Sequence, residues 1–184
     1  MLQKTPFYFL RHGQTDWNLE HRCQGQTDVP LNATGIGQAG DAKARLTDIP
    51  IATICCSPLG RARQTAEIVN EALNCRFVVI DGLQECRFGE AEGKLITHET
   101  YHKLIRSAGT TGGEIFEDFV ERAIAGLNQA IVEPGPVLVV AHGGIFNALQ
   151  FHVGLDYDGD IKNCVPVRFD PPTNKNNVWK MISV

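Results

Sequence analysis

Long hydrophobic runs are absent from this sequence, although 43% of its 184 residues are hydrophobic. One of the longest apolar runs, Val137–Ala141, falls far short of the ~18 residues that a membrane-spanning helix needs. The segment from Met1 to Pro6 also lacks the apolar stretch of a secretory signal peptide. We therefore expect a cytoplasmic protein that does not bind membranes.

The chain also has little excess charge of either sign. It contains 17 basic and 21 acidic side chains, for a net charge of −4, and no long block of like charges. Proteins that bind nucleic acids typically carry a basic patch or a strongly basic domain. The composition therefore argues against a nucleic acid as partner.

The cysteines show no pattern of a disulfide scaffold or a metal site. There is no Cys-x-x-Cys pair and no zinc spacing, and disulfide-rich domains are usually shorter and secreted. Free cysteines are commonly buried in apolar surroundings. We expect no metal, and we expect reduced thiols at all six positions: Cys23, Cys55, Cys56, Cys75, Cys86 and Cys164.

Short apolar runs alternate with stretches of helical periodicity along the chain. Four of these runs predict buried strands, at residues 7–10, 51–56, 77–80 and 137–141. Two further strands joined by a turn are expected at residues 165–170 and 178–184. No Pro-, Gly- or Ser-rich linker divides the chain, so we expect one domain over residues 1–184.

The segments between these runs predict helices. One should begin near residue 34, with a periodic stripe at Ile36, Ala39, Lys43 and Leu46. In the next helix we expect Ser57 as N-cap and Pro58 as the first helical residue. Further helices are expected from Glu114 to Pro134 and through about Phe151. Strand–helix alternation with apolar strands predicts an α/β fold, a three-layer α/β/α sandwich with a mostly parallel sheet.

Residues that can carry chemistry follow the predicted strands at their carboxyl ends, where ligands bind in open α/β sheets. Arg11 and His12 follow the first strand, Arg61 lies one helical turn beyond the second, and His142 follows the fourth. Two guanidinium groups and two imidazoles suit an anion such as a phosphoryl group. Backbone N–H groups at Gly13 and Gly143 are candidates for further donors.

The residues alone leave two questions open at this point. A single histidine after a strand is more often a core or cap residue, but two such histidines together with two arginines favour a site. Several carboxylates near the third strand are equally placed to act as an acid: Asp81, Glu85, Glu90 and Glu92.

Five segments carry a resemblance to a known family. They are Phe9–Asn18, which includes Arg11-His12-Gly13, then Gln24–Asn32, Ser57–Ala66, Leu83-Gln84-Glu85 with Phe88-Gly89, and Val140–Gly144. The residue types in these segments, and the order of the segments along the chain, resemble the motifs of the histidine phosphatase superfamily, in its phosphoglycerate mutase-like branch. The resemblance runs from residue 9 to about residue 147, which is most of the chain.

This resemblance implies a role for each matching residue. His12 would be the nucleophile that becomes phosphohistidine, and Glu85, selected from the four carboxylates by the family pattern, would be the proton donor. A protonated His142 would stabilise the transition state. The phosphate would be held by Arg11, Arg61, Asn18 and Gly143, and the loop at Gln24 and Gly25 would touch phosphate or substrate. No metal or cofactor is required, because the arginines supply the positive charge.

The segment after Glu85 bears on the kind of reaction. Residues 86–112 would form a short cap, whereas mutases of the family usually carry a longer insertion and a mobile C-terminal tail. A short cap favours water as acceptor, so we expect a metal-independent phosphomonoester hydrolase acting on a small phosphorylated metabolite. The alternatives are mutase-type phosphoryl transfer and a non-catalytic phospho-ligand binder. Neither the particular substrate nor the oligomeric state follows from the sequence.

Other residues carry weaker expectations. Ala91, Ile115 and Asn147 depart from the family pattern, which puts the specificity of relatives in doubt for this chain. Core packing is the favoured interpretation of four residues that are also candidates for lining the pocket: Trp17, Phe88, Tyr101 and His102. Arg63 is expected at the surface, and no role is assigned to His21, His98 or His152.

Overall fold

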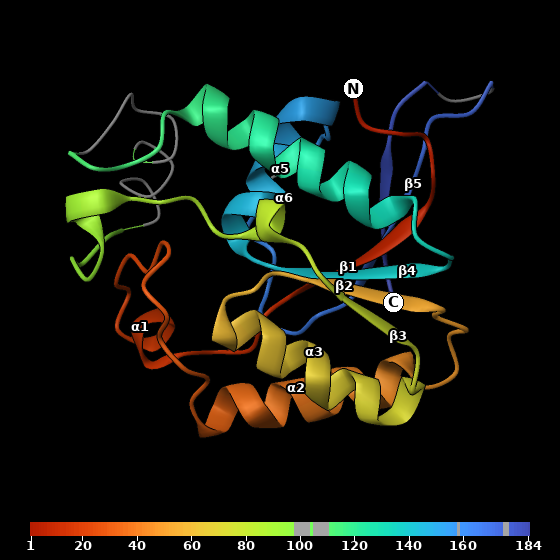
Figure 1. The fold of residues 1–184 in the computed structure, drawn as a ribbon, viewed down its shortest axis with the longest axis horizontal. Coiled ribbons are helices and arrows are strands. Elements are labelled where there is room, and N and C mark those ends of the chain that lie inside the picture. The colour runs from red at the N-terminus through yellow and green to blue at the C-terminus, as the bar shows by residue number, and fades with distance from the viewer. Residues whose placement is uncertain (98–103, 105–110, 158, 175–176) are drawn as a thin grey trace.

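The computed structural model describes residues 1–97, 104, 111–157, 159–174 and 177–184 of the chain. Within these residues the strands form one sheet in the order β3-β2-β4-β1-β5-β6 (Figure 1). The first four strands in the chain pair in parallel, β5 pairs antiparallel with β1, and β6 pairs antiparallel with β5. Their bounds are β1 Phe7–Arg11, β2 Thr53–Cys56, β3 Arg76–Val79, β4 Val137–Ala141, β5 Val167–Asp170 and β6 Lys180–Ser183.

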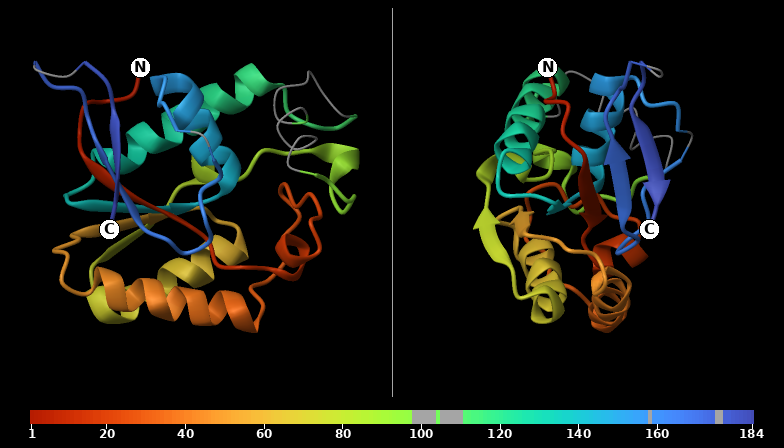
Figure 2. Two further views of the ribbon diagram at one scale, coloured as in Figure 1. Left: turned by 180° about the vertical axis from the view of Figure 1, so that it is seen from behind. Right: turned by 90° about the vertical axis from the view of Figure 1, so that its right-hand side faces the viewer.

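Helices cover both faces of this sheet. Helices α2 (Ala33–Leu46) and α3 (Gly60–Leu73) lie together on one face, and α5 (Phe116–Ile131) and α6 (Gly143–Val153) lie together on the other (Figures 1 and 2). Two apolar clusters follow from this arrangement, one under each helix pair. The predicted three-layer α/β/α architecture with a mostly parallel sheet is confirmed.

Successive residues of the central strands pack alternately into the two apolar clusters. In β4, Leu138 and Val140 pack toward α2 and α3, whereas Val137 and Val139 pack toward α5 and α6. A strand that is buried on both faces reads as an unbroken apolar run, which explains the pattern of β4. The edge strand β3 differs, because Arg76 and Val79 are exposed.

Two helix predictions were wrong in detail. Helix α3 begins at Gly60 with Leu59 as N-cap and no side-chain capping bond, so Ser57 and Pro58 precede the helix. In α2 the side chain of Ile36 is exposed and Gly35 is buried beside it, while Ala42 takes the place expected for Lys43 between Ala39 and Leu46 on the buried face. The stripe was misread because glycine and alanine make up much of that face.

Short elements connect the layers on the side where the site lies. Helix α1 (Asp16–Leu19) begins with Thr15 as N-cap, and single 3₁₀ turns occupy Asp81–Leu83 and Gly89–Ala91. Of the predicted cap, residues 86–97, 104, 111 and 112 are described; His98, Tyr101 and His102 lie outside the described residues.

The cysteines are free and, except for the half-buried Cys75, buried. Burial raises the pKa of Cys23 to about 12, and the same holds for Cys55 and Cys56. The expectation of burial is confirmed for Cys23, Cys55, Cys56, Cys86 and Cys164, and Cys75 is the exception. In the part of the chain that the structure describes, no helix combines the length and apolarity that crossing a membrane requires.

Candidate active site

The sheet register brings the two expected histidines together. Strands β1 and β4 pair with Arg11 opposite Ala141, and the N–H of His12 donates to the carbonyl oxygen of Ala141 at 3.0 Å. His12 and His142, which follow these strands, therefore lie side by side, with ring centroids 5.2 Å apart. Their closeness is a direct result of parallel pairing between strands that are far apart in sequence.

Two buried or half-buried guanidinium groups complete this end of the site. Arg61 projects from the first turn of α3 and is 1% exposed, and its terminal nitrogens donate to the carbonyl oxygens of Gly25 (2.7 Å) and Thr27 (2.9 Å). Arg11 donates from Nη1 to the carbonyl oxygen of Ile161 at 2.9 Å. Hydrogen bonds to backbone carbonyl oxygens thus orient both guanidinium groups.

Glu85 follows the 3₁₀ turn after β3 and is buried. Its Oε1 accepts from the N–H of Cys86 at 2.8 Å, and its Oε2 accepts from the N–H of Gly144 at 3.0 Å. Desolvation raises the pKa of Glu85, although these two hydrogen bonds and the charge of Arg61 oppose the rise. Of the four carboxylates that the sequence left open, Glu85 is the one that lines the pocket.

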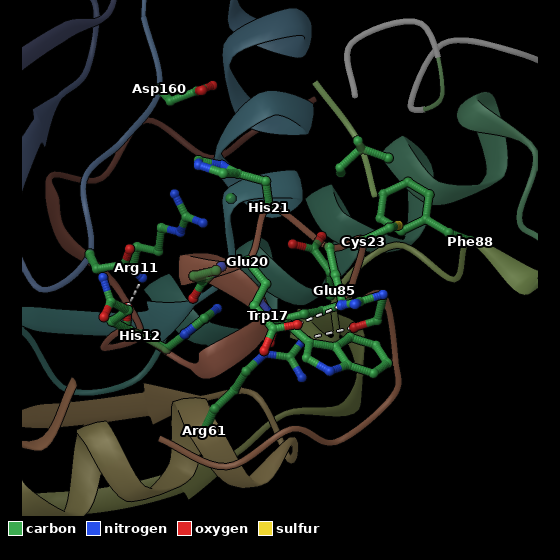
Figure 3. A pocket seen from close by; sticks show the side chains of 18 of the residues that line it. Arg11, His12, Trp17, Glu20, His21, Cys23, Arg61, Glu85, Phe88 and Asp160 are labelled. Atoms are coloured by element: carbon green, nitrogen blue, oxygen red, sulfur yellow. Dashed lines mark hydrogen bonds and ion pairs between the residues drawn. The ribbon is translucent and has the colours of Figure 1, made fainter. Parts of the chain in front are cut away.

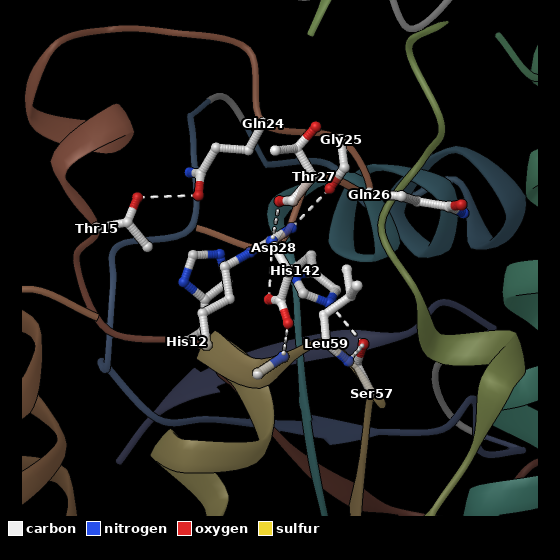
Figure 4. A network of polar contacts seen from close by, with 12 residues as sticks. His12, Thr15, Gln24, Gly25, Gln26, Thr27, Asp28, Ser57, Leu59 and His142 are labelled. Carbon is white, nitrogen blue, oxygen red and sulfur yellow. Dashed lines mark hydrogen bonds and ion pairs between the residues drawn. The ribbon is translucent and has the colours of Figure 1, made fainter. Parts of the chain in front are cut away.

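Burial holds the pKa of both histidines well below the usual value, and the positive charges of Arg61 and Arg11 add to the effect. The Nδ1 of His12 lies 2.7 Å from the carbonyl oxygen of Gly13. The Nε2 of His142 lies 2.8 Å from Oγ of Ser57 (Figure 4). The lowered pKa favours a neutral imidazole at His142, whereas the charge of the transition state led us to expect a protonated one.

Three side-chain nitrogens of the site are buried without a hydrogen-bond partner among the described residues. They are Nε of Arg11, Nε of Arg61 and Nδ1 of His142. Buried polar atoms nearly always have partners, so unpaired ones need an explanation. Two of these nitrogens belong to permanent cations, which makes an anion the ligand that fits the set.

These residues surround one end of a pocket of about 910 Å³, where Arg11, His12, Arg61 and Glu85 point toward a common space (Figure 3). His142 is fully buried behind this space. The other expected site residues also line the pocket: Asn18, Gln24, Gly25 and Gly143.

Three of the residues expected to contact the ligand also support the local structure. Asn18 closes a capping box with Thr15, and Oε1 of Gln24 accepts from the hydroxyl of Thr15 at 2.9 Å. Gly25 adopts φ +54°, and a Cβ there would lie 2.1 Å from Oε1 of Glu92. The left-handed backbone favours glycine at this position, and the missing Cβ leaves room for the Glu92 carboxylate.

The expectation that Gly13 donates to the ligand was wrong. Its N–H donates to the hydroxyl oxygen of Thr65 at 3.1 Å, inside helix α3, and a Cβ would meet the backbone of Gly35 at 2.4 Å. Glycine is needed here because the chain leaving β1 passes directly over α2. Gly13 therefore supports the packing of the loop that carries His12.

Sequence reasoning missed several contacts in and around the site. Ser57 contacts His142, and His21, which has a left-handed backbone with φ 55°, lines the pocket. Glu92 accepts from the N–H groups of Thr27 (2.9 Å) and Phe88 (3.0 Å). The partners of Ser57 and Glu92 lie far from them in sequence, apart from Phe88, so no local signal pointed to these contacts.

The weaker expectations have mixed outcomes. Trp17 and Phe88 line the pocket, and so does Asn147. Phe88 is also part of the core, as its favoured interpretation required. Arg63 lies at the surface as predicted, where it pairs with Glu67 at 2.9 Å.

Comparison with known proteins places this site in context. Residues 7–160 match the model of the histidine phosphatase superfamily, branch 1. A protein named "Uncharacterized phosphatase PhoE" from Bacillus subtilis strain 168 is 41% identical over 148 residues, covering 79% of this chain and 75% of its own. A protein named "Probable phosphoglycerate mutase GpmB" from Proteus mirabilis is 35% identical, covering 94% of this chain and 86% of its own.

Solved structures show the same fold. A mycobacterial glucosyl-3-phosphoglycerate phosphatase in complex with VO₃ superposes with a TM-score of 0.81 at 26% identity, covering 97% of this chain and 98% of its own. A phosphoglycerate mutase from Thermus thermophilus superposes with a TM-score of 0.75 at 29% identity, covering 97% of this chain and 99% of its own. Both phosphatases and mutases are therefore among the similar proteins.

Proposed function

Because this chain belongs to branch 1 of the histidine phosphatase superfamily, we propose that it hydrolyses small phosphomonoesters through a phosphohistidine on His12, without a metal ion. The observation that carries this proposal is the set of three buried, unpartnered nitrogens of Arg11, Arg61 and His142 beside His12, as counted among the described residues. A phosphoryl group offers several acceptor oxygens and negative charge, so it matches this set.

His12 is suited to attack phosphorus. The carbonyl oxygen of Gly13 can only accept, so the ring proton lies on Nδ1 and a lone pair remains on Nε2. The lowered pKa keeps the ring neutral. In the first step Nε2 bonds to phosphorus, and the ester P–O bond breaks with its electron pair on the leaving oxygen.

Glu85 supplies the proton that the leaving oxygen needs. Its raised pKa favours the protonated carboxyl group before this transfer. In the second step the Glu85 carboxylate takes a proton from water as the water attacks phosphorus. The bond between phosphorus and Nε2 of His12 then breaks, and inorganic phosphate leaves.

The remaining residues hold the phosphoryl group while charge spreads over its equatorial oxygens. Arg11 and Arg61 supply fixed positive charge, and His142, Asn18 and the N–H of Gly143 supply further donors. Because two guanidinium groups already offset the charge, no metal is needed in this scheme. Gln24 contacts the substrate, and Gly25 acts through its carbonyl bond to Arg61.

Mutase-type transfer is the second candidate, favoured by the mutase-named relative that covers 94% of this chain. It would use the same phosphohistidine but return the phosphoryl group to a substrate hydroxyl instead of water. Conversion of 3-phosphoglycerate to its 2-phospho isomer, without release of inorganic phosphate, would support this candidate.

The test uses the purified chain with p-nitrophenyl phosphate and a ³²P-labelled phosphate ester. We expect turnover and an acid-labile phosphoprotein, both lost in His12→Ala. His152→Asn is the matched control, because His152 is an exposed histidine in the last turn of α6.

Three outcomes would contradict parts of the proposal. Comparable turnover by His12→Ala would overturn the assignment of the nucleophile. Loss of activity with EDTA and its return with a divalent cation would overturn the metal-free scheme. Tight binding of phosphate without turnover or a phosphoprotein would indicate a phospho-ligand binder.

A further inference from the structure

Ser57 holds a buried hydroxyl group that the proposed chemistry does not use. It is fully buried at the end of β2, where its N–H donates to the carbonyl oxygen of Val140 at 3.1 Å. Strand β2 pairs with β4, so Ser57 lies beside the residues that follow β4. Its Oγ lies 2.8 Å from Nε2 of His142, and Figure 4 shows this contact beside His12.

The neighbours of this hydroxyl group indicate where its proton points. The N–H of Leu59 donates to Oγ of Ser57 at 3.3 Å and occupies one of the two lone pairs of the oxygen. Among the described residues, Nε2 of His142 is the hydrogen-bond neighbour of Oγ that can accept the hydroxyl proton. An imidazole that accepts at Nε2 and is neutral carries its own proton on Nδ1.

We propose that Ser57 is a positioning residue whose hydroxyl group holds His142 in the Nδ1–H tautomer, so that this N–H donates to a phosphoryl oxygen. The inference rests on the proposed function, which places a phosphoryl group beside His142. Nδ1 of His142 is one of the three buried nitrogens without a partner among the described residues. In the opposite tautomer a lone pair on Nδ1 would face the anion and repel it.

The two neighbouring histidines thus receive opposite roles from their hydrogen-bond partners. The carbonyl oxygen of Gly13 places the proton of His12 on Nδ1 and leaves a lone pair on Nε2 for attack. Ser57 also places the proton of His142 on Nδ1, but here Nε2 is occupied and Nδ1 is the nitrogen left for the ligand. One ring is therefore a nucleophile and the other a donor.

The experiment compares wild-type protein with Ser57→Ala and Ser57→Thr. Two-bond ¹H–¹⁵N correlation spectra of histidine-labelled protein report the tautomer, with His142→Gln used to assign the signals. We expect Nδ1–H for His142 in wild type and in Ser57→Thr. In Ser57→Ala we expect a mixture of tautomers and about tenfold weaker binding of inorganic phosphate, the effect of one lost hydrogen bond.

Thr53→Val is the matched control, because Thr53 is a buried residue at the opposite end of β2 whose hydroxyl group donates to the carbonyl oxygen of Pro134. This variant should keep the His142 tautomer and the phosphate affinity. A merely structural role of Ser57 would lower stability in the same way as Thr53→Val without changing the tautomer.

The inference is overturned if wild-type His142 carries its proton on Nε2. It is also overturned if Ser57→Ala leaves both the tautomer and the phosphate affinity unchanged. Should Ser57→Ala fail to fold, the spectra of wild type and Ser57→Thr decide. Failure of the proposed function would appear separately, as a lack of turnover in the wild-type protein. The His142 tautomer and the affinity for inorganic phosphate do not depend on turnover, so they test the inference independently.

Discussion

Burial raises the pKa of Glu85, and its hydrogen bonds leave room for a proton on the carboxyl group. Each carboxyl oxygen accepts one backbone N–H, from Cys86 and Gly144, and keeps a second acceptor position where the proton can reside. A Cβ on Gly144 would lie 2.0 Å from Oε1 of Glu85, so only glycine allows this approach. The second glycine after His142 thus has a specific purpose in holding the acid.

The role of Glu85 predicts a dependence on the leaving group. In Glu85→Gln, kcat/KM for alkyl phosphates should fall by about 10²–10⁴, the usual contribution of general acid catalysis. Aryl phosphates should lose less, because their leaving oxygen needs no proton. In wild type, kcat/KM for alkyl phosphates should also decline as the pH rises through the raised pKa of Glu85. The glutamine variant should lack this decline.

These effects are measured as kcat/KM for a series of phosphomonoesters across the acidic to mildly alkaline pH range. Glu90→Gln is the control, since Glu90 is an exposed acid on the same segment. An equal loss for all leaving groups in Glu85→Gln would argue against proton donation and for a role in binding alone.

At the scale of elements, one loop joins the phosphate end of the site to the acid. The carbonyl oxygens of Gly25 and Thr27 accept from Arg61, while the side chain of Gln26 donates to the carbonyl oxygen of Glu85 at 3.1 Å. Glu92 holds this loop, because it accepts from the N–H of Gln26 at 3.1 Å and from the N–H of Thr27 at 2.9 Å. We therefore expect Glu92, which does not line the pocket, to position Arg61 through this loop.

Removal of the Glu92 carboxylate should weaken the binding of phosphate. In Glu92→Ala, several backbone N–H groups lose their acceptor, and we expect inorganic phosphate to bind about 10- to 100-fold more weakly. Titration calorimetry with phosphate measures the change. The exposed neighbour Glu90→Ala should bind phosphate as wild type does. Unchanged affinity in Glu92→Ala would show that Arg61 keeps its position without the loop contacts.

The sequence predicted elements better than it predicted contacts between them. The apolar run of β4 and the residues that follow β1 and β4 were placed correctly, because strand patterns are local. The role of Ser57 was misread, since a serine before proline is typical of a helix start and its actual partner lies 85 residues away. Choosing Glu85 among four carboxylates likewise required the family pattern, because their distances depend on how the chain folds.

At the scale of the whole molecule, the site concentrates positive charge in a chain with a net charge of −4. Arg61 is buried, and burial lowers its pKa, although the acidic groups Glu85 and Asp28 partly compensate. A buried charge without full compensation reduces the stability of a fold. An anion that binds between Arg11 and Arg61 should therefore stabilise the whole protein.

This reasoning predicts that inorganic phosphate raises the melting temperature. At a phosphate concentration of about 100 times Kd the stabilisation is about 2.7 kcal/mol, or about 5–10 °C for a domain of this size. Differential scanning calorimetry in phosphate and in sodium chloride of equal ionic strength separates binding from screening. The rise should disappear in Arg61→Gln, because this change removes a fixed charge of the site. An equal rise in Arg61→Gln would place the phosphate elsewhere, and no rise in wild type would contradict an anion site between these arginines.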